Sequence, residues 1–268
     1  MTTLGFIGAG NMGSALMKGF SASEAAKDVS VCVYDSSREK AEMMKAAGFC
    51  VLENEIDVVC KCKYVVLACK PQQLAELLSK IKDCITSGTV FISLCAGISL
   101  GYIRERTTAA TKAALVMPNL PMLLGEGSSA IAYDEALSAE EAEFVRSLIE
   151  SCGTAELIPV DKMNEVICLN ASSPAFIYLF AKQFTDYAAA EGINQQSALN
   201  LFSQTLIGSA KMLMESGSDI QVLIDRVSSA GGTTVAGLDA LNAGGFPETI
   251  RNACIACTKR AYELGSTV

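Results

Sequence analysis

The sequence predicts an α/β fold in which a Rossmann-type doubly wound sheet precedes an all-helical domain. Over about the first 160 residues, short β-branched runs alternate with helical patterns, which is typical of a parallel sheet with crossover helices. A glycine-rich turn, Gly8-Ala-Gly-Asn-Met-Gly13, joins the first run to the first helix. From about Asp161 onward, apolar residues recur only at helical spacing. We therefore divide the chain into a Rossmann domain, residues 1–160, and a helical domain, residues 161–268.

Five strands are expected in the first domain. Each is a short run rich in β-branched and other apolar residues and is bounded by polar or turn residues. The expected strands are Leu4–Ile7, Val29–Tyr34, Tyr64–Cys69, Val90–Leu94 and Ala113–Met117.

Capping patterns mark the helices of this domain. The first helix follows the glycines, from Met12 to about Phe20. Ser36-Ser-Arg-Glu39 has the spacing of a capping box and opens a helix that runs to Ala47, where Gly48 ends it. A second capping box, Ser138-Ala-Glu-Glu141, opens another helix.

The helical domain has more apolar surface than its size can hide. One helical face contains Leu199, Phe202, Leu206 and Leu213, and a second, after a helix start at Gly245-Phe-Pro247, contains Ile250, Cys254, Cys257, Ala261 and Leu264. The run Val166 to Ala181 has no charge and many large apolar groups. A domain of about 110 residues buries too little of this surface by itself. We expect a hydrophobic dimer interface built from these helices.

Composition excludes several classes of function. The 268 residues include 21 Lys plus Arg and 29 Asp plus Glu, which gives a net charge of −8. An acidic chain lacks the basic face of a dedicated nucleic-acid binder and the charge that favours a membrane surface. The chain contains no histidine, so histidine triads, imidazole acid–base catalysis and histidine-bearing zinc sites are excluded.

The 11 cysteines do not form a metal-binding pattern. Most lie in apolar runs and are expected to be small buried side chains. The pairs Cys60-Lys-Cys62 and Cys254-Ile-Ala-Cys257 have no second pair at zinc-ligand spacing. The N-terminus runs directly into Leu4 without a basic region or cleavage site, so we expect a reduced, cytoplasmic protein. The uncharged stretch Cys84 to Ile103 contains glycines and favours a short buried strand with loops over a membrane span.

The glycine turn indicates a dinucleotide site. After a strand, the first glycine makes a tight turn, the second lets the backbone approach a pyrophosphate, and the third allows close packing of helix on strand. At the end of the second strand, Asp35 is suited to the ribose hydroxyl of NAD, whereas Ser36, Ser37 and Arg38 are suited to the extra phosphate of NADP. The residues leave both cofactors open, and Asp35 can equally be only a turn residue.

A second glycine loop, Val227 to Thr234, lies directly before the apolar helical stretch Val235 to Leu241. Its glycines allow close backbone approach, and the hydroxyls of Ser229, Thr233 and Thr234 can join helix N–H groups in an anion pocket. Such a loop suits a carboxylate. The alternative is an ordinary interhelical turn in which Ser and Thr cap the helix.

With both loops placed, the chain resembles the pyrroline-5-carboxylate reductase family from about Thr3 to Gly265. The motifs that resemble it are Gly5-Phe-Ile-Gly-Ala-Gly-Asn-Met-Gly13, Leu67-Ala-Cys-Lys-Pro-Gln72, Ser93-Leu-Cys-Ala-Gly97, Met117-Pro-Asn119, Gln204-Thr-Leu-Ile-Gly208, Lys211-Met-Leu213, Val227 to Thr234 and Gly245-Phe246. The resemblance implies reduction of the cyclic imine pyrroline-5-carboxylate to proline by NADPH or NADH, the last step of proline biosynthesis. It also implies a homodimer held by interlocking helices, with dimers assembled into larger rings in many members.

The resemblance further implies roles for individual residues. The phosphate loop is Gly8, Ala9, Gly10, Asn11, Met12 and Gly13, and the residues flanking ribose and nicotinamide are Ala68, Cys69, Lys70, Pro71, Cys95, Ala96 and Gly97. Ser36 and Arg38 match the adenosine-ribose region, and Asn54 matches an adenosine contact. The substrate carboxylate is held by the loop containing Ser229, Gly231, Gly232, Thr233 and Thr234. The hydroxyl of Thr234 is placed near the imine nitrogen.

The absence of histidine agrees with this chemistry. Hydride attack on an imine carbon is helped by protonation of the nitrogen, and the substrate can arrive as an iminium ion. The protein then has mainly to orient the substrate, bind its carboxylate and provide a hydrogen bond from Thr234.

Four departures from the family pattern bear on the substrate. Ala230 replaces a usual proline, Phe176 a tyrosine, Leu115 stands near a usual arginine, and Leu120 replaces a threonine. A reductase of a six-membered piperideine carboxylate is therefore the main alternative. A dinucleotide-binding regulator without turnover is a second, although it has no need of a carboxylate loop. A β-hydroxyacid dehydrogenase is a third, and it requires a catalytic lysine.

Overall fold

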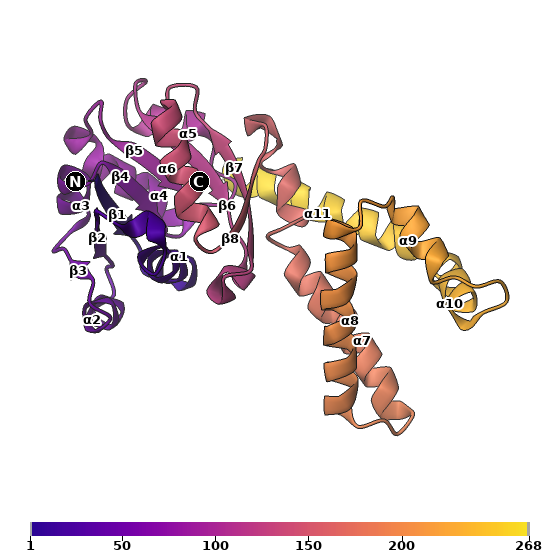
Figure 1. Ribbon diagram of the computed structural model, residues 1–268. Helices are drawn as coiled ribbons and strands as arrows, with labels where there is room; N and C mark the ends of the chain where they lie inside the picture. Colours follow the sequence, from indigo (N-terminus) through magenta and orange to yellow (C-terminus); the bar gives the residue numbers. More distant parts are fainter. Residues whose placement is uncertain (1, 267–268) are drawn as a thin grey trace. The chain divides into compact units, whose positions relative to one another are not determined.

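The computed structural model describes residues 2–266 and contains an eight-stranded sheet with the order β3-β2-β1-β4-β5-β6-β7-β8 (Figure 1). The strands are β1 (Thr2–Ile7), β2 (Val29–Tyr34), β3 (Cys50–Val51), β4 (Tyr64–Leu67), β5 (Val90–Ser93), β6 (Lys112–Met117), β7 (Gly127–Tyr133) and β8 (Gly153–Leu157). Neighbouring strands are parallel except for the antiparallel pair β6 and β7. The order of the first six strands is that of a Rossmann fold, which confirms the predicted fold class.

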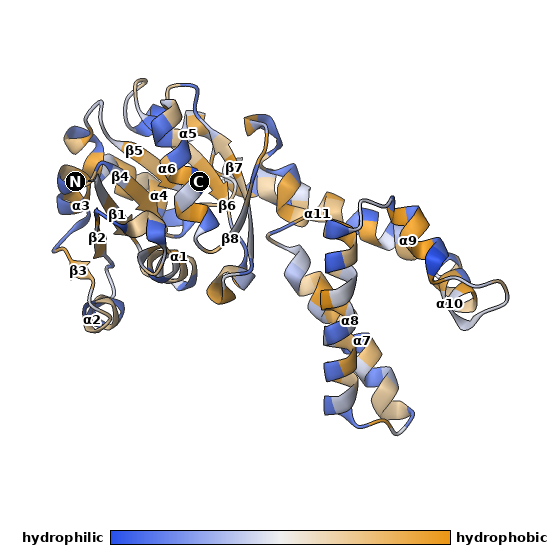
Figure 2. Cartoon of the chain, in the orientation of Figure 1, coloured by the Kyte–Doolittle hydropathy of each residue, from blue (hydrophilic) through white to orange (hydrophobic). Residues whose placement is uncertain are grey.

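Two sets of helices cover the two faces of the sheet. The helices of this part of the chain are α1 (Asn11–Ser21), α2 (Arg38–Ala46), α3 (Glu55–Lys61), α4 (Pro71–Ile81), α5 (Leu100–Arg106) and α6 (Ala139–Glu150). Successive side chains of a strand point to opposite faces of the sheet. Leu4 and Phe6 pack with α1 and α6, whereas Ile7 packs with α3 and α4. Because both faces are covered, the central strands are mainly apolar, as their largely orange colour in Figure 2 shows.

The structure agrees with the expected elements at most positions and corrects some of them. The expected strand Tyr64–Cys69 is two residues too long, because β4 ends at Leu67 and Ala68 and Cys69 form the loop that follows. The first expected capping box is wrong: Ser37 and not Ser36 caps α2 and accepts a hydrogen bond from the Lys40 N–H, and a lysine at that position cannot complete a box. The box at Ser138 is confirmed, with both of its hydrogen bonds present.

The chain divides into two compact units, each described by itself. One contains the residues up to Ser172 together with those from Ala256 onward, and the other is Ser173–Ile255. These units differ from the division at residue 160 expected from the sequence. The segment before α7 belongs with the sheet, because Asn170 Nδ2 donates to the backbone oxygens of Met117 and Ser128 at 2.6 and 3.0 Å.

The helical unit has little core of its own. Its helices are α7 (Ser173–Ala190), α8 (Gln195–Glu215), α9 (Ile220–Arg226), α10 (Thr233–Ala243) and the first part of α11 (Phe246–Ser266). The buried residues of α7 and α8 are Pro174, Thr185, Ala188 and Ala198. Leu201 and Met214, by contrast, are 70% and 73% exposed. A single copy thus leaves a large apolar surface uncovered, as a self-associating unit does.

Residues 2–266, the part that the structure describes, have neither a membrane-spanning helix nor a cluster of metal ligands. No helix among them is long and apolar enough to cross a membrane. No group of three or more cysteine or acidic side chains among them is placed to hold a metal ion.

Candidate functional site

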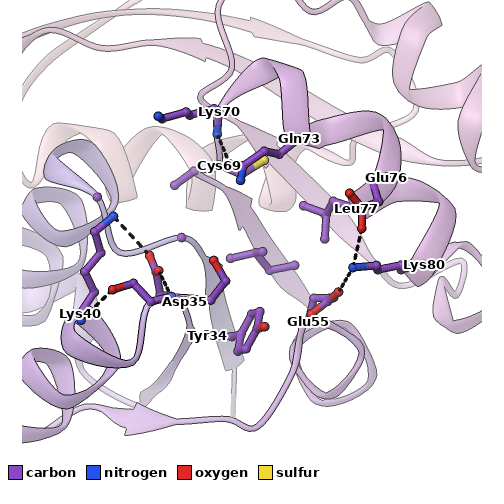
Figure 3. Close-up of a pocket in the computed structure, with 16 residues that line it drawn as sticks. Tyr34, Asp35, Lys40, Glu55, Cys69, Lys70, Gln73, Glu76, Leu77 and Lys80 are labelled. Atoms are coloured by element: carbon purple, nitrogen blue, oxygen red, sulfur yellow. Dashed lines mark hydrogen bonds and ion pairs between the residues drawn. The ribbon is translucent and has the colours of Figure 1, made fainter.

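A cavity of about 530 Å³ opens at the carboxyl ends of β1, β2 and β4 (Figure 3). In a sheet of this order, β1 and β4 flank the point where the direction of winding reverses, and ligands bind in the crevice outside the strand ends there. The lining residues are Ile7, Gly8, Gly10, Tyr34, Asp35, Ser36, Ser37, Lys40, Glu55, Ala68, Cys69, Lys70, Gln73, Glu76, Leu77 and Lys80. Seven of the residues predicted for the cofactor are among them, namely Gly8, Gly10, Asp35, Ser36, Ala68, Cys69 and Lys70.

The three glycines of the loop between β1 and α1 have different surroundings. Gly8 has a φ of +109°, and a Cβ on it would lie 2.6 Å from the Ala68 backbone oxygen. A Cβ on Gly13 would lie 2.3 Å from the Gly8 backbone oxygen, so this glycine allows helix and strand to pack closely. A Cβ on Gly10 would meet no atom within 4 Å, and Gly10 lines the cavity. The space beside Gly10 is therefore open to a ligand.

The N-terminal end of α1 is suited to an anion. Gly10 is the N-cap and has no side chain to cap the helix, and the first turn holds no acidic residue. Uncapped N–H groups and the positive end of the helix dipole favour a phosphate at this position. Together with the space beside Gly10, this end of the helix fits the pyrophosphate of a dinucleotide.

Asp35 holds the phosphate loop in place. Its Oδ2 accepts a hydrogen bond from the Ala9 N–H at 2.7 Å, and its Oδ1 accepts one from the Ser37 N–H at 2.8 Å. Lys40 Nζ lies 3.9 Å from the same carboxylate and remains half-exposed on the rim of the cavity. Each carboxylate oxygen thus accepts one backbone hydrogen bond, and Asp35 ties the end of β2 to the loop between β1 and α1.

The opposite wall of the cavity carries charges that sequence reasoning missed. Lys80 Nζ lies 2.9 Å from Glu76 Oε1 and 3.4 Å from Glu55 Oε1 (Figure 3). The hydrogen bonds that Lys80 donates to the carboxylates of Glu76 and Glu55 raise its pKa above the ordinary value. The spacing of Glu76 and Lys80 on α4 is a visible signal of a pair on one helix face. The approach of Glu55 from α3 depends on tertiary packing.

Several predicted cofactor residues lie outside the lining of this cavity. They are Ala9, Asn11, Met12, Gly13, Arg38, Asn54, Pro71, Cys95, Ala96 and Gly97. Asn54 caps α3, with its Oδ1 accepting from the Asp57 N–H at 2.8 Å. Pro71 is the first residue of α4, and the Lys70 N–H before it donates to Gln73 Oε1 at 3.3 Å. Asn54 and Pro71 thus stand at the starts of two helices beside the cavity.

Gly97 is explained by the packing of α11. It has a φ of +77°, and a Cβ on it would lie 3.0 Å from the Ala261 backbone oxygen. A Cβ on Gly265 would in turn lie 2.4 Å from the Gly97 oxygen. The loop after β5 and the C-terminal part of α11 thus approach each other through two glycines. Beside them, Leu115 is buried on β6 and lines a second, very small cavity with Cys95 and Gly97.

The second glycine loop lies in the helical unit, between α9 and α10. Gly231 has a φ of +71°, and the Gly232 N–H donates to the Ser229 backbone oxygen at 2.9 Å. Gly232 is the N-cap of α10, and no side chain caps this end. The hydroxyl-bearing residues Ser229, Thr233 and Thr234 are exposed. The geometry that suits a carboxylate is present, and the Ser or Thr cap of the alternative interpretation is not.

Comparisons with known proteins identify a family for each part of the chain that contains a glycine loop. Residues 161–264 match the family described as pyrroline-5-carboxylate reductase dimerisation, and residues 3–97 match the NADP oxidoreductase, coenzyme F420-dependent family. The pyrroline-5-carboxylate reductase of Methanosarcina acetivorans is 34% identical over 263 residues, 98% of this chain and 97% of the relative. That of Pisum sativum is 34% identical over 262 residues, 98% of this chain and 96% of the relative.

A solved structure agrees over the same span. The crystal structure of the Plasmodium falciparum pyrroline carboxylate reductase with NADP bound superposes with a TM-score of 0.88 at 29% identity, over 98% of both chains. The dimerisation match supports self-association of the chain, and the uncovered apolar surface of the helical unit agrees with it. The family resemblance predicted from the sequence is thereby confirmed: the chain belongs to the pyrroline-5-carboxylate reductase family.

Proposed function

We propose that this chain reduces L-1-pyrroline-5-carboxylate to L-proline with NADPH or NADH, as the last step of proline biosynthesis. The observation that carries the proposal is a pair of helix N-termini, those of α1 and α10, each preceded by a glycine loop and each left without a side-chain cap. One suits a pyrophosphate and the other a carboxylate. A pure dinucleotide-binding regulator has no use for the second.

The chain's own residues position and polarise the substrate. The loop Gly8 to Gly13 holds the phosphates, while the loops Ala68 to Pro71 and Cys95 to Gly97 flank the ribose and nicotinamide. The bound cofactor supplies the hydride. Ser229, Gly231, Gly232 and Thr233 bind the substrate carboxylate with their hydroxyl and N–H groups. Thr234 places its hydroxyl at the imine nitrogen, which the substrate brings already protonated, so no histidine is required.

NADPH is the preferred cofactor in this proposal. Asp35 is the residue suited to the ribose hydroxyl of NADH, but both of its carboxylate oxygens accept backbone hydrogen bonds. Ser36 and the Lys40 ammonium group line the cavity beside it, and both are exposed. A hydroxyl and a cation at this position attract the 2′-phosphate that distinguishes NADPH.

In this proposal, two copies associate through residues within the predicted segment 161–268, supported by the dimerisation family match to residues 161–264. We further propose that the dimers assemble into rings and that the enzyme works in the cytoplasm without a nucleic-acid or membrane partner. The net charge of −8 supports the absence of a nucleic-acid partner.

The activity is tested by loss of nicotinamide absorbance when the purified full chain is mixed with pyrroline-5-carboxylate. Parallel reactions contain NADPH or NADH, and a third set contains a six-membered piperideine carboxylate. Rapid oxidation with the five-membered imine is the expected result. Oxidation only with the six-membered imine would assign the second substrate, and cofactor binding without oxidation by either would favour a regulator.

Two variants test the assigned roles. Thr234→Val is expected to lower kcat, and Thr234→Ser, which keeps the hydroxyl, to restore most of it. Lys40→Gln is expected to lower kcat/KM for NADPH about tenfold, equivalent to ~1.4 kcal/mol, with little change for NADH. Lys45→Gln on the same helix is the control, because Lys45 is exposed and does not line the cavity. Equal losses with both cofactors would remove Lys40 from phosphate recognition.

A further inference from the structure

Cys69 and Cys95 lie opposite each other at the carboxyl ends of adjacent strands. The parallel strands β4 and β5 pair Leu67 with Ser93, and each cysteine follows its paired residue by two positions. Adjacent strands are about 4.8 Å apart, within the range of Cα separations of about 4.4–6.8 Å that a disulfide spans. The register therefore places the two residues where their side chains can be joined.

The contacts of the two thiols agree with this placement. Cys95 Sγ lies 3.3 Å from the Cys69 backbone oxygen and 3.7 Å from that of Leu67. The two side chains are hydrogen-bonded to each other. Cys69 also lines the dinucleotide cavity, whereas Cys95 is 5% exposed in the core behind it. Both are free thiols: Cys69 is half-buried in the cavity wall, and Cys95 is buried.

The pair has the chemical asymmetry of a reactive thiol and its resolving partner. The hydrogen bond from Cys95 lowers the pKa of Cys69, and the same hydrogen bond, together with burial, raises that of Cys95. Cys69 is thus the thiolate-forming member, and thiolates are the species that oxidants attack. Other thiols of the domain differ: burial raises the pKa of Cys62 to about 12 and also raises that of Cys152.

We propose that Cys69 is an oxidation site inside the cofactor cavity and that Cys95 converts the oxidised thiol into a disulfide. Hydrogen peroxide accepts two electrons from the Cys69 thiolate, which becomes a sulfenic acid as hydroxide leaves. The Cys95 sulfur then attacks the Cys69 sulfur. The S–S bond forms, the S–O bond breaks, and the released hydroxide takes the Cys95 proton to give water.

Bond formation changes the wall of the cavity. The bond holds Cys69 Sγ against Cys95 at covalent distance, and the loop that carries Cys69 also begins α4 at Lys70. Cofactor affinity is therefore lost on oxidation, and bound cofactor covers Cys69 and protects it. The inference rests on the dinucleotide site of the proposed function and is independent of the substrate.

The experiment uses the purified full chain with hydrogen peroxide as the oxidant and NADP⁺ as the cofactor. The first readout is peptide mapping. Trypsin does not cleave between Lys70 and Pro71, so Cys69 lies in the peptide Tyr64–Lys80, and Cys95 lies in Asp83–Arg104. The expected product is a cross-link between these two peptides that dithiothreitol reverses. Since Cys84 shares the second peptide, the Cys84→Ser variant must retain the cross-link.

The second readout is NADP⁺ binding by calorimetry. Oxidation is expected to weaken binding at least tenfold, and dithiothreitol to restore it. Saturating NADP⁺ is expected to slow alkylation of Cys69 by iodoacetamide at least tenfold. Neither measurement requires a substrate, so a failure of imine reduction would leave this inference standing. A failure of the cross-link would leave the proposed reductase activity standing.

Variants separate the two thiols. In Cys95→Ser, oxidation is expected to stop at a sulfenic acid on Cys69, which dimedone traps, and no cross-link forms. Cys69→Ser is expected to form neither product, and Cys50→Ser to behave as the unmodified chain. A cross-link confined to other cysteines, or oxidised protein that binds NADP⁺ as the reduced protein does, would overturn the proposal. Peptide mapping of the oxidised, unmodified chain tests the cross-link even where a variant fails to fold.

Discussion

Alanine substitutions in the glycine loop between β1 and α1 are expected to affect stability and cofactor binding separately. Alanine at Gly8 meets two obstacles, a φ of +109° and a contact of 2.6 Å with the Ala68 backbone oxygen. Alanine at Gly10 meets neither, because its φ is −69° and no atom lies within 4 Å of the new Cβ. Gly48, which follows α2, has a φ of +90° with open space around it. Gly48 therefore tests backbone strain alone, Gly8 tests strain together with a steric contact, and Gly10 tests cofactor binding alone.

The magnitudes follow from these surroundings. Gly48→Ala is expected to cost about 1–2 kcal/mol of unfolding free energy, the strain of a left-handed residue with a Cβ. Gly8→Ala adds a steric contact to this strain, and overpacking costs about 1–3 kcal/mol, so the total is about 2–5 kcal/mol. Gly10→Ala is expected to leave the unfolding free energy within about 0.5 kcal/mol of the unmodified chain. It is nevertheless expected to weaken NADPH binding more than tenfold, because the methyl group occupies the space of the pyrophosphate.

The assay is urea unfolding at one fixed protein concentration, combined with NADPH binding followed by the fluorescence of the nicotinamide. A fixed concentration is needed because self-association contributes to stability. If Gly10→Ala binds NADPH with unchanged affinity, the phosphates do not lie at this end of α1. If Gly10→Ala unfolds at as low a urea concentration as Gly8→Ala, the space beside Gly10 is too small for a methyl group. Either result would refute the assignment.

Three further predictions follow from buried or uncovered groups. Asn170→Ala removes two buried hydrogen bonds to the Met117 and Ser128 backbone oxygens and is expected to cost about 2–4 kcal/mol in urea unfolding. Burial raises the pKa of Glu141, but hydrogen bonds from the Ser138 N–H and Lys112 outweigh it and leave the pKa below its ordinary 4.5. The stability that this carboxylate adds is therefore present above that pH and lost as the pH falls through the lowered pKa. Between neutral pH and acid, the urea concentration at the unfolding midpoint is therefore expected to fall less for Glu141→Gln than for the unmodified chain. Leu201→Lys, at a residue 70% exposed on α8, is expected to shift sedimentation toward monomer, whereas Met43→Lys on α2, at a residue 56% exposed, leaves it unchanged.

Sequence reasoning located the strands that carry strong β-branched patterns and missed those that do not. The strand β7 begins with Gly-Ser-Ser, and β8 reads Gly-Thr-Ala-Glu-Leu, so neither shows the composition expected of a strand. Instead, β7 is fixed by pairing with β6, and β8 by pairing with β7. The two-residue strand β3 is too short to show any period. Such elements depend on contacts between distant residues, which a local pattern does not record.

The candidate site shows the same division between local and long-range signals. Gly8, Gly10 and Asp35 were found because a turn between strand and helix imposes local rules. The role of Asp35 remained open because its partner, the Ala9 N–H, is 26 residues away along the chain. Lys40 was missed because an exposed lysine on a helix has no distinctive sequence pattern. Glu55 was missed because only the packing of α3 beside α4 brings it to Lys80.

The helical unit ties the proposed chemistry to self-association. No residue of α9 or α10, both of which the structure describes in full, is buried within one copy. The loop Ser229 to Thr234 joins these two helices. A loop is positioned only as firmly as the elements that carry it, and a reaction that relies on orientation requires a fixed position. A partner copy packed on these helices would hold this loop in position and so contribute to catalysis. A chain without histidine, whose chemistry rests on placement, depends on this contribution more than one with a strong acid or base.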